Sequence, residues 1–185
     1  MNKPEMYDTT PACASETEPL ITGGHRCTIQ HVAEVKSKSG MAMLVIEFDT
    51  DIYDSQPCYF AGLYLTDPRF QTLWPGSKWL LIDERAKDTA GESFGIRNLK
   101  QFIGAVEESN PDFRVSWGKN FCSCFKGKKV GIVFGREEYL NSCGYVRQAV
   151  AARYFRSIEG VEEAPVPRFR PLSVKNAQRR HSCCS

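Results

Sequence analysis

Two consecutive stretches of the chain alternate apolar with polar residues, and this pattern limits the fold more than any other feature. A period of two places every second side chain on the same face of an extended strand, so each stretch predicts a half-buried β-strand. Residues 37–40, with the sequence Ser-Lys-Ser-Gly, form a short turn between them, which predicts a β-hairpin. The alternating apolar residues are Cys27, Ile29, Ala33 and Val35 in the first stretch and Ala42, Leu44, Ile46 and Phe48 in the second.

The middle of the chain predicts more strand and then a helix. Residues 58–65 are β-prone and aromatic, and residues 79–82 extend the same sheet. After Asp88 the period changes, because apolar residues recur at spacings of three and four until Pro111, which cannot continue a helix. These spacings predict one amphipathic helix over residues 93–109. Its apolar stripe consists of Ile96, Leu99, Ile103 and Val106, with Phe102 beside them.

The last third of the domain predicts a second hairpin. Apolar residues alternate from Val130 to Phe134 after a basic turn at 126–129, and residues 141–144 form the next turn. Residues 145–158 fit a strand or a helix, since an apolar residue at every fourth position satisfies both periods. The hairpin context favours the strand. Its even-numbered face holds Val146, Val150, Tyr154 and Ile158, which predicts that Tyr154 belongs to the core.

This order of elements predicts a β-rich α+β fold. Three strands, a helix and two strands is the order of an oligonucleotide/oligosaccharide-binding (OB) barrel, so we expect an OB-like five-stranded barrel with one helix between strands 3 and 4. An α+β sheet covered by one helix has a similar order and remains the alternative.

Charge and proline divide the chain into three parts. Residues 1–20 carry a net charge of −3 and predict a flexible acidic leader. Residues 165–185 carry +5, with no acidic residue and three prolines in their first seven positions, and predict a basic disordered tail. Because the whole chain carries +2, the OB-like domain that remains, residues 21–164, is neutral.

The cysteines do not form a recognisable metal or disulfide pattern. The chain has eight, but it lacks a secretory signal and has enough apolar residues for a core, so we expect free thiols. His25, Cys27 and His31 share one face of the predicted strand. The two histidines would lie roughly 20 Å apart there, too far to bind one metal ion. We therefore expect no metal site.

Motifs of catalysis are missing from the sequence. It contains no Walker loop, dinucleotide fingerprint or paired zinc ligands, so we expect neither an enzyme nor a cofactor. Its longest apolar run is Met41 to Ile46, where a membrane-spanning helix needs about 20 residues, and the N-terminus has no secretory signal. We expect a cytoplasmic protein with no membrane partner.

Aromatic and basic residues are mixed on the predicted sheet and its loops. Single-stranded nucleic acid binds such surfaces, because bases stack on aromatic rings while arginine meets phosphate. Tyr145, Arg147 and Arg153 have the same parity on the closing strand and are the leading set. The full candidate nucleic-acid-binding set is Tyr145, Arg147, Arg153, Arg136, Tyr139, Trp79, Lys128 and Lys129. The alternative interpretation places many of these aromatic residues in the barrel core.

Four sequence segments resemble a family of small proteins encoded by bacteriophages and prophages of Gram-positive bacteria. The segments begin Gly23-Gly24-His25, Leu44-x-Ile46-x-Phe48-Asp49 and Phe102-Ile103, and the fourth runs from Lys126-Gly127-Lys128-Lys129 to Glu137-Glu138-Tyr139. The resemblance covers roughly residues 20–160, and residues 51–79 depart from the family's pattern. It implies a single-stranded-DNA-binding protein that acts in replication or recombination within the bacterial host cell.

Two functions follow as hypotheses. The first is a phage-type single-stranded-DNA-binding protein with replication or recombination proteins as possible partners. The second is a protein-binding accessory factor that engages a replication or host protein, and the neutral charge of residues 21–164 favours it, since nucleic-acid-binding domains are usually basic. The sequence leaves the oligomeric state open.

Overall fold

Two antiparallel hairpins form most of the sheet in the computed structural model, which describes residues 18–70, 72–141 and 143–172. The first hairpin, β1 (Gly23–Lys36) and β2 (Ala42–Thr50), confirms the prediction from the alternating residues. The second, β4 (Lys129–Leu140) and β5 (Val146–Arg156), confirms that the ambiguous closing segment is a strand. The short strand β3 (Ser77–Leu81) pairs with β2.

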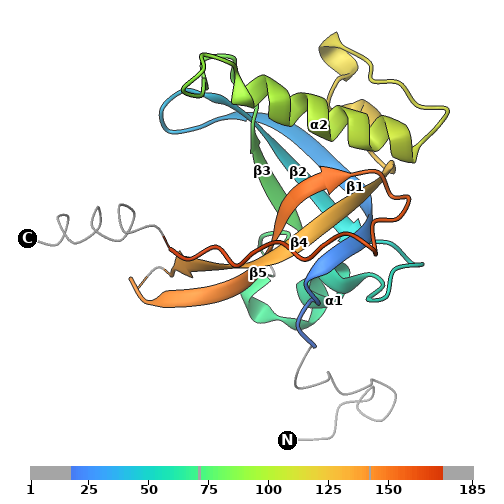
Figure 1. The fold of residues 1–185 in the computed structure, drawn as a ribbon. Coiled ribbons are helices and arrows are strands. Elements are labelled where there is room, and N and C mark those ends of the chain that lie inside the picture. Colours follow the sequence, from blue (N-terminus) through green and yellow to red (C-terminus); the bar gives the residue numbers. More distant parts are fainter. Residues whose placement is uncertain (1–17, 71, 142, 173–185) are drawn as a thin grey trace, which may run out of the picture.

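The five strands have the spatial order β3-β2-β1-β4-β5, so β3 and β5 are the outer strands. The sheet is strongly curved, with the long helix α2 (Phe94–Ser109) across one end and the short helix α1 (Tyr59–Thr66) near the other (Figure 1). The largest fully buried side chains include Phe48, Phe102, Phe125, Phe134 and Phe155. The fold is therefore β-rich α+β, as predicted.

A β-bulge changes which residues of β1 face the core. The pairing of β1 with β2 shifts between Ile29 and His31, so that Val32 is buried and Ala33 is only half-buried. The predicted continuous alternation through Val35 is therefore wrong beyond Ile29. The same shift leaves His31 exposed although His25 is buried, so the two histidines do not share one environment.

Residues 58–65 do not form the predicted strand, because they fold into the helix α1 (Tyr59–Thr66). The preceding strand supplies acceptors for the first N–H groups of this helix, which have no partner within the helix itself. Asp49 Oδ1 accepts from the N–H of Phe60 at 2.9 Å, and Thr50 Oγ1 accepts from the N–H of Tyr59 at 2.8 Å. The expectation of a single helix is corrected accordingly.

The predicted long helix is present as α2 (Phe94–Ser109). Ser93 caps it, since its Oγ accepts a hydrogen bond from the N–H of Ile96 at 3.2 Å. The helix buries Phe102 and Val106 against the core. Three short 3-10 turns complete the assignment: η1 (Pro68–Phe70), η2 (Gly118–Asn120) and η3 (Ser123–Phe125).

A second bulge, in β5, moves Tyr154 to the face opposite Val150. The pairing of β4 with β5 shifts at Arg153, so Val150 packs against the main core while Tyr154 packs on the outer face of the sheet. There Tyr154 contacts a small second cluster of Val133, Val161 and Ala164. Tyr154 is half-buried on this second cluster, so the prediction that it lies in the core on the same face as Val150 is wrong.

The chain after β5 returns across the outer face of β1 and β4. It passes so close that a Cβ atom on Gly24 would lie 1.6 Å from the Val161 carbonyl oxygen. It then pairs with the far end of β4, where Glu138 N–H donates to the Arg170 carbonyl at 3.0 Å. Residues 165–172 are thus ordered against the sheet, which corrects the predicted start of the tail at 165. Residues 1–17 and 173–185 lie outside the described part.

Candidate functional site

A groove of about 1250 Å³ lies between α1 and the β4–β5 hairpin. One wall comes from α1 and η1, the other from β4 and β5, and residues 19–22 close one side. Figure 1 shows α1 and this hairpin near the same end of the molecule, away from α2. The aromatic and arginine residues of the lining are Tyr59, Phe60, Phe70, Tyr139, Arg69 and Arg136.

The N-terminal part of the wall is held by the start of α1. The N–H of Leu20 donates to the Tyr59 hydroxyl oxygen at 3.0 Å, and the N–H of Ile21 donates to Gln56 Oε1 at 2.7 Å. The Leu20 side chain is buried in the main core. Segments more than thirty residues apart in the sequence therefore build one side of the groove.

Arg69 is the cation of the α1–η1 wall, and Asp67 holds it in place. The Arg69 guanidinium donates to both carboxylate oxygens of Asp67, and this interaction lowers the pKa of Asp67. Asp67 therefore stays ionised and offsets part of the arginine charge. The Arg69 side chain is 80% exposed, so it remains accessible to a further anion.

A second hollow of about 390 Å³ continues the groove along the gap between β3 and β5. The two share Phe60, Pro75 and Val150 in their linings. Lys78 of β3 crosses this gap, because its Nζ donates to the carbonyl oxygens of Ala152 at 2.7 Å and Arg153 at 3.0 Å. Burial lowers the pKa of Lys78 to about 8.

The carboxylates of Asp51 and Asp54 hold the loop between β2 and α1 against β1 through hydrogen bonds. His25 Nδ1 lies 2.8 Å from Asp54 Oδ1, and both side chains are almost fully buried. Burial opposes the charged imidazole, but the hydrogen bonds to Asp54 and to the Ile21 carbonyl outweigh it and raise the pKa of His25. Asp51 likewise accepts hydrogen bonds from Thr28 Oγ1 and Lys129 Nζ.

The structure brings part of the predicted set together at the β4–β5 hairpin. Arg136 and Tyr139 line the groove. Tyr139 is opposite Arg147 in the register, and Tyr145 follows beside the turn with 64% of its side chain exposed. Asn141 fixes this turn, because its Oδ1 accepts from the N–H of Tyr145 at 2.9 Å.

Arg153 and Trp79 lie apart from the hairpin tip. Arg153 occupies the β5 bulge, half-buried beside Gly135, and its Nη1 lies 3.5 Å from the Arg136 carbonyl oxygen. Trp79 of β3 lines the gap between β3 and β5 and is 59% exposed. Trp79 is therefore placed to contact a ligand in that gap, whereas Arg153 is partly covered.

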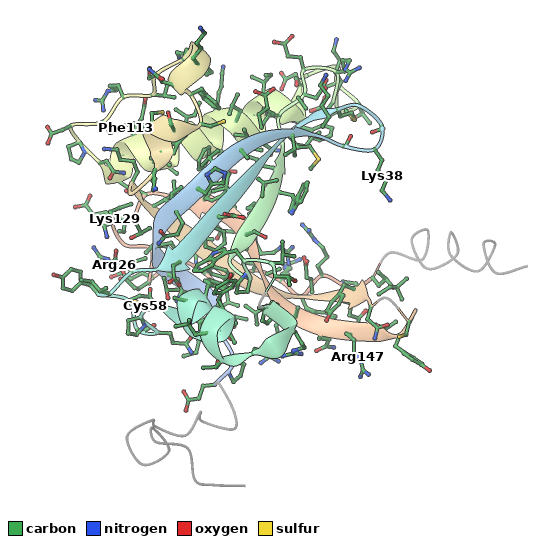
Figure 2. All side chains as sticks on the ribbon, turned by 180° about the vertical axis from the view of Figure 1, so that it is seen from behind. Arg26, Lys38, Cys58, Phe113, Lys129 and Arg147 are labelled. Atoms are coloured by element: carbon green, nitrogen blue, oxygen red, sulfur yellow. The ribbon has the colours of Figure 1, made fainter. Side chains whose placement is uncertain are left out.

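Lys128 and Lys129 are not part of this site. They lie where the α2–β4 loop enters β4, and Figure 2 shows Lys129 far from Arg147. Lys129 is engaged by Asp51 and Thr28, so it does not present a free charge to a phosphate. Lys128 Nζ lies 4.9 Å from the centre of the Phe113 ring. Both lysines belong to the candidate nucleic-acid-binding set, and the structure places them apart from the hairpin residues of that set.

Sequence reasoning missed the α1 side of the groove and the gap between β3 and β5. The missed residues are Tyr59, Arg69, Phe70 and Lys78. The aromatic residues and the arginine in residues 59–70 could have indicated this wall. The strand predicted for residues 58–65 gave no reason to place them opposite the hairpin, because these residues form the helix α1.

The described residues contain neither a cluster of metal ligands nor a membrane-spanning helix. These contain no group of three or more His, Cys, Asp or Glu side chains placed to hold a metal ion. The thiols of Cys27, Cys58, Cys122 and Cys124 are free. Neither α-helix in the described ranges has the length and apolar character needed to cross a membrane.

Comparison with protein-family models and with curated proteins finds no match to this chain.

Proposed function

We propose that this protein binds single-stranded DNA without catalysis, in the groove between α1 and the β4–β5 hairpin and along its continuation between β3 and β5. The observation that carries the proposal is the lining of this groove. Tyr139 and Arg136 on one wall are opposite Phe70 and Arg69 on the other. Aromatic rings accept stacked bases and arginines bind phosphates, which are the two contacts that single-stranded nucleic acid requires.

The sheet supports an OB-like barrel as part of this proposal. In the order β3-β2-β1-β4-β5, joining β3 to β5 would close a five-stranded barrel, and α2 connects the third strand to the fourth. Lys78 contacts β5 across this gap through its side chain. OB folds bind oligonucleotides with the loop between strands 4 and 5. Tyr145 lies on this loop, and Tyr139 and Arg147 are paired strand residues beside it.

The biological setting of the proposal comes from the resemblance to phage-encoded proteins. It makes replication or recombination of a bacteriophage the process in which the binding occurs, and proteins of these processes its partners. Leu172, the last described residue, donates its N–H to Glu138 Oε2 near the far end of β4, and the sequence that follows it is basic.

A protein-binding accessory factor is the second candidate, with one observation in its favour. Asp67 offsets the charge of Arg69 in the groove, and residues 21–164 are neutral overall. An extended segment of a replication or host protein would then occupy the groove through its apolar lining, which includes Leu63 and Val150.

Fluorescence polarisation with labelled oligo(dT) and with duplex DNA tests the first proposal. We expect oligo(dT) to bind more tightly than duplex DNA. The Tyr139→Ala variant should lose about 1 to 3 kcal/mol of binding free energy for oligo(dT), because one base loses the side-chain ring on which it stacks. Arg136→Ala should reduce the log–log salt slope by about 0.7, since one phosphate contact is lost.

Two residues outside the groove serve as matched controls. One lies on the β1–β2 turn and the other on the loop between β2 and α1. Lys38→Ala also removes one positive charge, but Lys38 is on the β1–β2 turn, far from Arg147 (Figure 2). Tyr53→Ala removes an aromatic ring that is 81% exposed outside the groove. Equal losses in control and groove variants, or equal affinity for duplex and oligo(dT), would contradict the proposal. Groove variants that no longer bind a replication or host protein but still bind DNA would favour the accessory factor.

A further inference from the structure

Trp117, on the loop between α2 and β4, combines high exposure with a fixed orientation. Its side chain is 66% exposed, yet its ring stacks on Phe121 with centroids 5.2 Å apart and an interplanar angle of 14°. Phe121 in turn contacts the fully buried Phe125 edge to face at 5.3 Å. A continuous series of ring contacts thus holds the exposed indole against the core. Little rotamer freedom remains to be lost when a ligand stacks on its free face.

The loop around Trp117 is more basic than the rest of the folded chain. Residues 111–128 contain four basic side chains and one acidic, Asp112, whereas residues 21–164 are neutral. Within the described part, none of the four basic side chains forms an ion pair with a carboxylate. They are Arg114, Lys119, Lys126 and Lys128.

Two acidic side chains from other elements lie against this loop. Glu107 contacts it from α2, where Oε1 accepts from the N–H of Val115 at 2.9 Å. Glu34 of β1 lies beside Cys122. Lys119 and Lys126 are exposed, so their ammonium groups are open to an anion.

This surface is separate from the groove. The loop from 111 to 128 lies beside α2, at the other end of the sheet from the β4–β5 hairpin (Figure 1). Phe113 and Arg147 lie at opposite ends of the molecule in Figure 2. A ligand at Trp117 therefore makes contacts that no groove residue makes.

We propose that the Trp117 platform is a second contact site for single-stranded nucleic acid. The Trp117 platform consists of Trp117, Phe121, Arg114, Lys119, Lys126 and Lys128. One base stacks on the free face of the indole, and Lys119 and Lys126 meet the neighbouring phosphates. The choice of ligand class rests on the proposed function, but the site stands on its own residues. An exposed, flat aromatic ring on a loop with exposed lysines fits a base and its phosphates better than an acidic peptide, which has no ring to stack.

Intrinsic fluorescence of a variant with Trp74→Phe and Trp79→Phe tests the platform, because Trp117 is then the only tryptophan of the chain. Saturable quenching by oligo(dT), with no change on adding poly-glutamate, is the expected result. Unchanged Trp117 emission at saturating oligo(dT) would overturn the proposal, as would equal quenching by poly-glutamate, which would favour an acidic protein partner.

Affinity measurements on full-length variants provide a second readout that does not depend on the double substitution folding. Trp117→Ala should bind oligo(dT) about 5- to 150-fold more weakly, since one base loses its stacking surface, while Trp117→Phe should retain most of the affinity. Tyr53→Ala, which removes an exposed ring from an acidic loop, is the matched control and should bind normally. Equal affinities of Trp117→Ala and wild type would overturn the platform.

The two proposals fail in different ways. If Tyr139→Ala and Arg136→Ala weaken binding and Trp117→Ala does not, the groove binds DNA and the platform is refuted. If only Trp117→Ala weakens binding, the platform is supported and the groove is refuted. A wild-type chain that does not bind oligo(dT) refutes both.

Discussion

The Nζ atom of Lys78 lies 2.7 Å from the carbonyl oxygen of Ala152, and this contact links the two outer strands of the sheet. Ala152 immediately precedes Arg153, the extra residue of the β5 bulge, whose carbonyl is the second acceptor of the same ammonium group. A bulge interrupts the regular hydrogen bonds of a strand. The Lys78 side chain thus bridges β3 and β5 at the bulge.

The stability contributed by Lys78 should depend on pH. Its pKa is about 8 in the folded protein, because burial disfavours the charge, against 10.5 when exposed. Between these values the unfolded chain binds the extra proton, so folding becomes more favourable as the pH rises from 8 to 10.5. The unfolding free energy of wild type should gain up to about 3 kcal/mol relative to Lys78→Met over this range. Urea denaturation of both proteins at pH 7.5 and pH 10 measures the difference; a constant gap would contradict it.

His25 should have the opposite dependence on pH. Its folded-state pKa is raised above 6.5, since the hydrogen bonds to Asp54 and Ile21 outweigh burial, so the added stability is fully present below the unfolded pKa of 6.5. That stability is lost as the pH rises through the folded pKa. Asp54, whose pKa is lowered, remains ionised throughout this window. The advantage of wild type over His25→Gln in urea denaturation should therefore be larger at pH 6 than at pH 8.5, and a pH-independent advantage would contradict the assignment.

Tyr145 and Tyr154 should separate binding from stability. Tyr145→Ala removes a mostly exposed ring beside the hairpin turn, so we expect weaker oligo(dT) binding by about 1 to 3 kcal/mol and an unchanged melting temperature. Tyr154→Ala removes the ring that packs on Val133 and Val161, so we expect a loss of about 2 to 4 kcal/mol of stability and normal binding of the folded fraction. Thermal melts and polarisation titrations on both variants check this, and exchanged phenotypes would mean that the hairpin faces are wrongly assigned.

Gly24→Ala should detach the segment that follows β5. The new methyl group would meet the backbone of Val161 at 1.6 Å, a contact that only displacement of that segment relieves. We expect a clear fall in melting temperature and faster proteolysis after Arg156. Gly104→Ala is the control, because nothing lies within 4 Å of the added Cβ there and alanine favours the helix by roughly 0.5 to 1 kcal/mol. A Gly24→Ala protein as stable as Gly104→Ala would refute the close approach.

The elements that sequence predicted well are those with a long regular period. The alternation up to Ile29 and from Leu44 to Phe48, and the spacing from Ile96 to Val106, correspond to β1, β2 and α2. The errors begin where one inserted residue or one distant contact determines the local structure. A bulge after Ile29 or at Arg153 reverses the parity of all later residues without a signal in the period.

Long-range capping explains the error at α1. Residues 59–66 are apolar on all sides, so they show no helical period. Their first N–H groups are satisfied by Asp49 and Thr50, which lie on the preceding strand. The candidate site follows the same division: Arg136 and Tyr139 were predicted from a regular hairpin, whereas Arg69 depends on the placement of α1.

The pairing of Arg170 with β4 also determines where the chain can be shortened. The first paired residue of β1, Gly23, lies opposite Phe134, so the next part of β4 has the C-terminal segment beside it in place of β1. A protein ending at Ala164 would leave the N–H of Glu138 and the carbonyl of Arg136 without these partners, and exposed strand edges pair with other molecules. A change in DNA binding by that protein could then come from self-association or from the loss of basic charge, and the two effects could not be separated. A protein ending at Leu172 keeps this edge covered and isolates the charge of the tail.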